Sequence, residues 1–190
     1  QSAIVEQMGQ DIVDWTRDLI SREGGPDACV RPFTPAIDSQ GPYTGHGNDN
    51  PWGAQYAEHL TALMQADFGT VTRNMDRAVE GHYWRHSDGH GTPFVDKTWM
   101  GLRAAFPSAQ FDVMQVIGMD NDLIGPRASV LFSLSGRHDG WGTFGRPTGA
   151  DVFVMGLAQV EFGPRGIRRE YALIDETAIW KQILLATGAV

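Results

Sequence analysis

The chain has 190 residues, and its 42% share of hydrophobic residues suits a single globular domain with a sizeable core. The formal net charge of -8 disfavours nucleic acid and an anionic membrane surface as partners, because both are bound mainly through clustered Lys and Arg side chains. Cys29 is the only cysteine, which excludes an intrachain disulfide and a multi-cysteine zinc site and favours a reducing, cytoplasmic location. No apolar run reaches the roughly 18 residues that a membrane-spanning helix requires, so no membrane partner is expected.

The first part of the chain differs in composition from the rest. Apolar residues at helical spacing predict an amphipathic helix over residues 2 to about 22, which Gly24-Gly25-Pro26 should end. The stretch from there to Asn50 is rich in Gly, Pro, Asp and Ser and predicts a long extended connection. We therefore expect residues 1–50 to form a helix and an extended segment that pack onto a main domain of residues 51–190.

The main domain begins with a strong helix signal. Asn50 can cap a helix and Pro51 suits its first position, with Tyr56 on the apolar face. The pattern then predicts a short helix, a strand, a helix that ends at Pro107, four strands and a final helix, at about 68–75, 79–86, 92–106, 111–119, 128–138, 151–162, 167–174 and 176–188. The last three strands should form an antiparallel meander. This order predicts an α+β fold in which a strongly curved sheet wraps over helices.

Several short motifs occur in a characteristic order. They read LRAAFPSAQFDV from Leu102, GRHDG from Gly136, RPTG from Arg146, and Glu170-Tyr171 with Asp175 before the last helix. In this order they resemble the SnoaL-like polyketide cyclase family of the nuclear transport factor 2-like (NTF2-like, ketosteroid isomerase-like) superfamily, over roughly residues 51 to 188. The resemblance implies a cone-shaped NTF2-like (cystatin-like) fold with a curved mixed β-sheet and a hydrophobic pocket.

The resemblance also implies a homodimer formed by the outer face of the sheet. Alternation along the strands places an apolar set on that face, made of Leu131, Phe153, Met155 and Leu157.

The candidate catalytic residues are His138 and Asp175. His138 matches the histidine of the family's Gly-x-His-x-Gly segment, and a histidine can carry protons near neutral pH. Its alternative role is that of a strand-end histidine that hydrogen-bonds a loop. Asp175 would orient His138 or contact substrate, or else cap the last helix, since Asp is a favoured N-cap residue.

The candidate ligand-binding residues come from several elements. By resemblance Tyr171 lines the cavity on one strand face, which leaves Glu170 on the other face. Trp141 and Phe144 lie in the loop after His138 and suit a flat ring system, whereas helical spacing favours core packing for Trp99 and Trp52. The remaining candidates are Tyr56, Trp84, His86 and Ala158.

Cofactors and metals are not expected. His82 and His86 share a predicted strand face but stand about 13 Å apart, which is too far for both to bind one metal. The loop from His86 to His90 is more typical of a solvated turn than of a metal site. No glycine-rich segment opens a helix, so no nucleotide-phosphate loop is predicted.

Ala158 is the main departure from the family pattern. Family members that close a ring by aldol condensation carry an inward Asp at the matching position, where this chain has Gly156-Leu157-Ala158. The expected function is a cofactor-free polyketide cyclase that uses acid–base chemistry on a carbonyl or polyketide-like small molecule. The alternatives are a non-catalytic module that binds a small molecule or a partner, and an isomerase, hydratase or epoxide hydrolase reaction in the same pocket.

Overall fold

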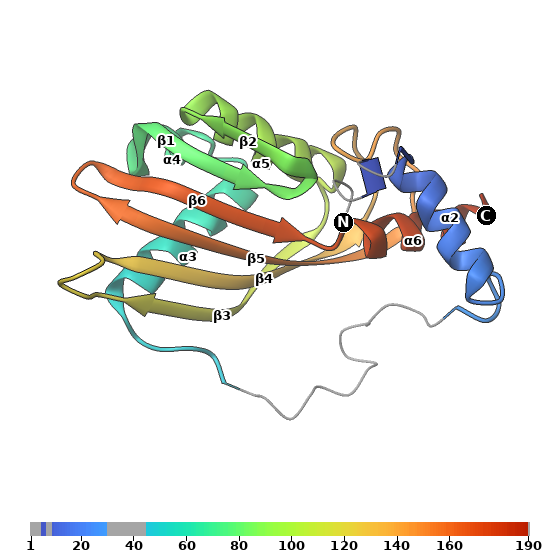
Figure 1. Ribbon diagram of the computed structural model, residues 1–190, viewed down its shortest axis with the longest axis horizontal. Helices are drawn as coiled ribbons and strands as arrows, with labels where there is room; N and C mark the ends of the chain where they lie inside the picture. The colour runs from blue at the N-terminus through green and yellow to red at the C-terminus, as the bar shows by residue number, and fades with distance from the viewer. Residues whose placement is uncertain (1–4, 7–8, 30–44, 190) are drawn as a thin grey trace.

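The computed structural model describes residues 5–6, 9–29 and 45–189, without the side chain of His86, and has a six-stranded sheet with helices against one face and at one end (Figure 1). The helices are α2 (Ile12–Arg22), α3 (Pro51–Met64), α4 (Gly69–Asn74), α5 (Thr92–Ala105) and α6 (Glu176–Thr187), with one 3-10 turn, η1 (Trp84–His86). The strands are β1 (Met75–Tyr83), β2 (Ser87–His90), β3 (Gln110–Met119), β4 (Arg127–Arg137), β5 (Asp151–Gly163) and β6 (Gly166–Ile174).

The sheet is mixed, with strand order β2-β1-β6-β5-β4-β3. β1 and β6 run parallel, and every other neighbouring pair is antiparallel. The predicted meander of β4, β5 and β6 is confirmed, and so is the α+β fold with a sheet over helices. β2 was not predicted, because its sequence Ser-Asp-Gly-His has no apolar alternation.

Two predicted elements end differently in the structure. The helix expected over residues 2–22 is interrupted, since Gly9 has a φ of +75° and α2 begins only after Asp11, whose carboxylate accepts a hydrogen bond from the Val13 amide at 2.8 Å. The strand expected over residues 79–86 ends at Tyr83, because Arg85 adopts a left-handed φ of 66°. Part of the predicted connection, residues 30–44, lies outside the described residues.

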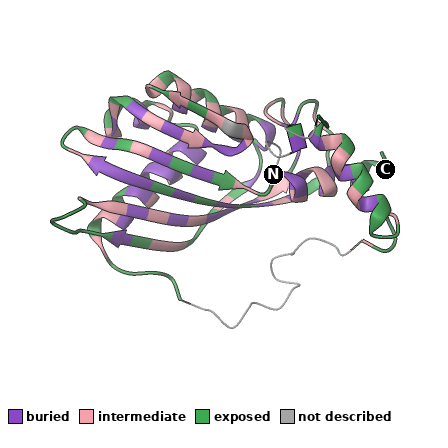
Figure 2. Cartoon of the chain, in the orientation of Figure 1, coloured by how far each residue is buried: buried purple, intermediate pink, exposed green. Residues whose placement is uncertain are grey.

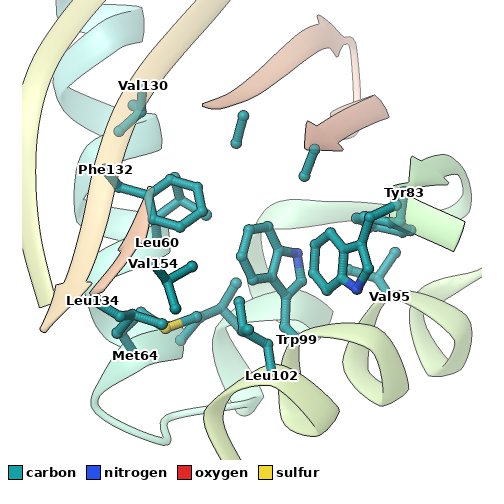
Figure 3. Packing of buried hydrophobic residues seen from close by; sticks show 14 of the residues in the cluster. Leu60, Met64, Tyr83, Val95, Trp99, Leu102, Val130, Phe132, Leu134 and Val154 are labelled. Atoms are coloured by element: carbon teal, nitrogen blue, oxygen red, sulfur yellow. The ribbon is translucent and has the colours of Figure 1, made fainter. Parts of the chain in front are cut away.

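The core lies between the sheet and α3 and α5. Alternate residues of β4 and β5 are buried against apolar faces of these helices, as the colouring in Figure 2 shows along each strand. Phe132 of β4 and Trp99 of α5 approach each other across this interior, with ring centroids 5.9 Å apart (Figure 3). Each such fully buried large apolar side chain stabilises the fold by about 1.5–3 kcal/mol.

The other face of the sheet carries exposed apolar side chains. Leu131, Leu157 and Leu173 stand directly opposite one another on β4, β5 and β6. Leu157 is 46% and Leu173 62% exposed. We call these residues, with Met155, the outer apolar face.

The segments before α3 attach to the domain at two places. α2 packs beside α6, where Lys181 pairs with Glu23 at 2.5 Å and Arg17 donates to the Ala189 carbonyl at 3.0 Å. Residues 46–48 run along the edge of β3, where the Val116 backbone bonds to His46 and Asn48. No helix within the described part of the chain is long and apolar enough to cross a membrane.

Candidate functional site

A buried carboxylate lies at the centre of the interior. Glu170 of β6 has no solvent exposure, and its side chain accepts three hydrogen bonds. The Tyr56 hydroxyl donates to Oε1 at 2.8 Å, and the Trp99 indole Nε1 donates to Oε2 at 2.9 Å. The Tyr83 hydroxyl also donates to Oε2. We call these four side chains the Glu170 cluster.

Each donor is positioned by a different element. Tyr56 lies on the core face of α3 with Leu60 and Leu63, and Trp99 lies on the core face of α5. Tyr83 is the last residue of β1, which is the parallel neighbour of β6. Three elements that are distant in sequence therefore converge on one carboxyl group.

The surroundings of the Glu170 cluster change its acidity. Burial raises the pKa of Glu170 above its usual range, and the three donors only partly offset this effect because they favour the charged form. Burial and the neighbouring carboxylate likewise raise the pKa of Tyr56 and Tyr83, so both phenols keep their protons. The cluster therefore combines a carboxyl group of weakened acidity with two hydroxyl donors.

Small side chains line the sheet next to Glu170. Ala158 and Ala172 are paired across β5 and β6, and both are buried on the inner face. Ala158 thus occupies the inward position that the sequence analysis gave it, without the carboxylate expected of ring-closing family members.

His138 lies in a separate place, beyond the end of β4. Its side chain is buried, Nδ1 lies 3.0 Å from the Thr148 hydroxyl, and its ring packs against Phe106 with centroids 5.6 Å apart. Nε2 is buried and has no hydrogen-bond partner among the described residues. Burial lowers the pKa of His138, and nearby Asp139 partly offsets this. Its bonds are those of a strand-end histidine that holds its loop.

Asp175 caps the last helix. Its carboxylate accepts a hydrogen bond from the Ala178 amide at 3.0 Å, which is the N-cap geometry of α6. Among the described residues it makes no hydrogen bond to His138, so the structure does not bring the two predicted catalytic residues together.

Tyr171 does not face the interior, and that expectation is wrong. Its side chain is 38% exposed and stacks on the His82 ring at 4.8 Å, whereas Glu170 and Ala172 point inward. The predicted alternation of side chains along β6 is correct, but the set that faces the interior contains Glu170 and Ala172 and not Tyr171. Tyr171 and Leu173 are more apolar than Glu170 and Ala172, yet they belong to the outer face because that face is apolar too.

The aromatic candidates divide into buried and exposed residues. Trp84 is buried against Tyr83 and Trp99, at ring-centroid distances of 5.8 Å to each, and thus adjoins the Glu170 cluster. Phe144 is buried between Phe106 and Trp180. Trp141 is 70% exposed and does not contribute to this interior.

Two further residues named from the sequence are His86 and Trp52. His86 lies in the turn after β1 and not on the strand face that it was predicted to share with His82, and its side chain lies outside the described residues. Trp52, expected in the core, packs its ring against Phe162 at 4.6 Å and donates to Asp120 at 3.2 Å. Within the described residues no three His, Cys, Asp or Glu side chains are grouped to hold a metal ion.

Sequence reasoning missed the Glu170 cluster. A single glutamate at an alternating strand position gives no signal of burial, because most glutamates are exposed. The available signal was the set of three aromatic donors on core-facing positions, since a buried Tyr or Trp needs a polar partner.

Comparison with known proteins is informative at the level of structure. No protein-family model matches the sequence, and no curated protein sequence matches it either. Among solved structures, AclR from Streptomyces galilaeus, a proposed hydroxylase, superposes with a TM-score of 0.57 at 16% identity, over 73% of this chain and 85% of that chain. IdmH from Streptomyces antibioticus, a proposed polyketide cyclase, gives 0.57 at 15% identity, over 70% and 99%. A SnoaL-like polyketide cyclase from Agrobacterium tumefaciens gives 0.53 at 18% identity, over 70% and 98%.

The chain has the SnoaL-like polyketide cyclase fold. The resemblance inferred from the sequence motifs is thereby confirmed for the fold. Identities of 15–18% leave the chemistry of the SnoaL-like interior to be argued from its own side chains.

Proposed function

We propose that this SnoaL-like protein is a cofactor-free acid–base enzyme for a hydrophobic carbonyl or polyketide-like small molecule, and that Glu170 is its proton carrier. The observation that carries the proposal is the convergence of Tyr56, Tyr83 and Trp99 on the buried Glu170 carboxyl. A carboxyl of raised pKa among fixed donors is a common arrangement for proton transfer at carbon next to a carbonyl.

The hydrogen-bond pattern suggests separate roles for the two carboxylate oxygens. An ionised carboxylate offers about four acceptor positions. Oε2 holds Tyr83 and Trp99, whereas Tyr56 is the only described donor to Oε1. We assign Oε1 as the basic atom. Rotation of the Tyr56 hydroxyl towards a substrate oxygen would free Oε1 to take the proton and would place a donor on the developing enolate.

Substrate entry requires movement of the elements around the cluster. Glu170 and Tyr56 are completely buried, and Tyr83 is 4% exposed. Opening of covering segments before chemistry is common among enzymes with enclosed sites. A hydrophobic substrate would then replace aromatic contacts of Trp84 and Trp99.

Glu170→Gln is the direct test. The amide is isosteric, its oxygen can accept from Tyr83 and Trp99, and its NH2 group can donate to the Tyr56 oxygen. With a panel of hydrophobic carbonyl and polyketide-like compounds, we expect turnover to fall by about a hundredfold or more with melting nearly unchanged. Turnover equal to that of the wild type would refute the role of Glu170.

His138 is the second candidate for the proton carrier, and it is favoured by its Nε2 atom, which has no hydrogen-bond partner in the described part of the chain. His138→Gln should lower turnover as strongly as Glu170→Gln if His138 is the base. If His138 only holds its loop, the variant should melt at a lower temperature and keep its turnover.

A binding module without turnover is the rival function, and Ala158 favours it because ring-closing members of the family carry an Asp there. In that case no compound of the panel is consumed by the wild type. Aldol cyclisation that appears only in Ala158→Asp would support the rival, since the pocket would then lack only the base.

A further inference from the structure

Asp96 of α5 is a titratable group that the proposed chemistry does not yet use. Its side chain is partly buried, and its Oδ1 is enclosed without a hydrogen-bond partner among the described residues. A buried carboxylate oxygen without a hydrogen-bond partner is energetically unfavourable, so the presence of Asp96 at this position requires an explanation. A water molecule or a moving proton would satisfy it.

Asp96 lies on the helix that carries Trp99 of the Glu170 cluster, and its charge acts on the Tyr83 hydroxyl. Phe94 and Trp99 of α5, on either side of it in sequence, both contact the Tyr83 ring, with centroids 5.7 Å and 6.2 Å away. Figure 3 shows Tyr83 beside Val95, the residue before Asp96. Tyr83 in turn donates to Glu170, which is completely buried, whereas Asp96 is only partly buried.

We propose that Asp96 is the outer member of a proton path that connects Glu170 to solvent through the Tyr83 hydroxyl. The use of this path in catalysis rests on the function proposed above. Glu170 has no solvent exposure, so a group that connects it to the surface is needed for its proton to exchange with solvent.

The transfer balances without a charged tyrosine. The Tyr83 hydroxyl, which donates to the ionised Glu170 carboxylate, turns towards Asp96 when Glu170 is protonated. The Glu170 O–H bond then breaks as its proton passes to the Tyr83 oxygen, and the Tyr83 O–H proton passes to the Asp96 carboxylate, directly or through one water. Asp96 then releases the proton to solvent. Because the raised pKa of Tyr83 prevents tyrosinate from accumulating, the two transfers must occur together. The charge of Asp96 contributes to that raised pKa.

The experiment measures proton exchange and needs no substrate. Carbon-13 NMR of glutamate-labelled protein gives the pH of the Glu170 transition, and stopped-flow pH jumps across it are followed by tryptophan fluorescence. The fluorescence of Trp99 should report the protonation of Glu170, because the Trp99 indole donates a hydrogen bond to the Glu170 carboxylate. Glu170→Gln identifies the part of the signal that belongs to Glu170.

We expect Asp96→Asn to slow the Glu170 relaxation at least tenfold, with Asp96→Glu close to the wild type. Tyr83→Phe removes the middle hydroxyl and should slow it similarly. Asp122→Asn, an exposed turn residue, is the matched control and should change nothing. A wild-type rate in Asp96→Asn overturns the proposal, and so does slowing in Asp122→Asn of equal size. Full turnover in Glu170→Gln would instead refute the proposed function and leave the exchange result standing.

Discussion

At the scale of single residues, the interior is unusual in burying groups that normally face water. Glu170 is stabilised by three donors, whereas the described residues provide hydrogen-bond partners for only one ring nitrogen of His59. His59 Nδ1 lies 3.3 Å from the Asn74 amide nitrogen, which can only donate, so Nδ1 is the acceptor and Nε2 carries the proton. Both residues should therefore respond strongly to substitution and to pH.

The fold should tolerate Glu170→Gln but should be destabilised by Glu170→Ala. Glu170→Ala leaves Tyr56, Tyr83 and Trp99 as buried donors without acceptors and opens a cavity. We expect a loss of about 3 kcal/mol or more in the free energy of unfolding, against about 1 kcal/mol or less for Glu170→Gln. Urea denaturation of both variants measures the difference. Equal losses would mean that the donors do not depend on the carboxyl oxygens.

His59 should make the fold sensitive to acid. Its side chain is 1% exposed, and burial lowers its pKa from 6.5 to about 4. Above pH 6.5 the folded and unfolded forms are both neutral. Between pH 6.5 and about 4 only the unfolded chain binds the proton, so His59 should lower the free energy of unfolding by up to about 3 kcal/mol across that window. The slope of stability against pH, measured for the wild type and for His59→Gln, isolates this term; parallel slopes would contradict it.

At the scale of elements, the backbones of α3 and β3 approach each other closely, which the pattern of side chains in the sequence does not predict. α3 lies so near β3 that a Cβ atom on Gly118 would stand 2.5 Å from the Gly53 amide nitrogen. Alongside it, Asn48 bonds the edge of β3 with its side chain. Its Nδ2 donates to the Gly118 carbonyl at 2.9 Å, and its Oδ1 accepts from the Gly118 amide at 3.0 Å. The side-chain amide thus replaces a neighbouring strand and protects an otherwise open edge.

Asn48→Ala should weaken this edge. The loss of two hydrogen bonds is expected to reduce the free energy of unfolding by about 1–2 kcal/mol. Hydrogen exchange of the Gly118 amide should accelerate at the same time. The neighbouring exposed Asp49 provides the control, because Asp49→Ala should leave both quantities unchanged. Unchanged exchange in Asn48→Ala would show that the contact does not protect the strand.

At the scale of the whole molecule, the sheet has one face packed on helices and one face with apolar side chains in solvent. The row of Leu131, Leu157 and Leu173 crosses three strands in register. Large exposed apolar patches commonly mark protein interfaces. We therefore retain the proposal of a homodimer through the outer apolar face.

Leu157→Arg should separate the proposed dimer. A charge at the centre of the face would have to be buried without a partner, which opposes association. Light scattering at micromolar concentration should give twice the chain mass for the wild type and the chain mass for the variant. Leu123→Arg, at a 92% exposed site in the turn before β4, should remain dimeric. A monomeric wild type would refute the proposal.

The sequence by itself determined the order and type of the elements apart from the short strand β2 and the turn η1. Asn50-Pro51 marks the start of α3, and alternating apolar residues mark β4 and β5, because capping and periodicity are local properties. The order of the motifs was sufficient to recognise the SnoaL-like fold. Local signals also separated the two faces of β6 correctly.

Only the tertiary structure decided which face of β6 is inside and which polar group lies there. Both faces of this sheet are apolar, so hydrophobicity alone could not choose between Glu170 and Tyr171. The partners of Glu170 come from α3, β1 and α5, up to 114 residues away along the chain, and their convergence depends on how the elements pack. A carboxyl group acquires its acidity from such neighbours, and no local pattern records them.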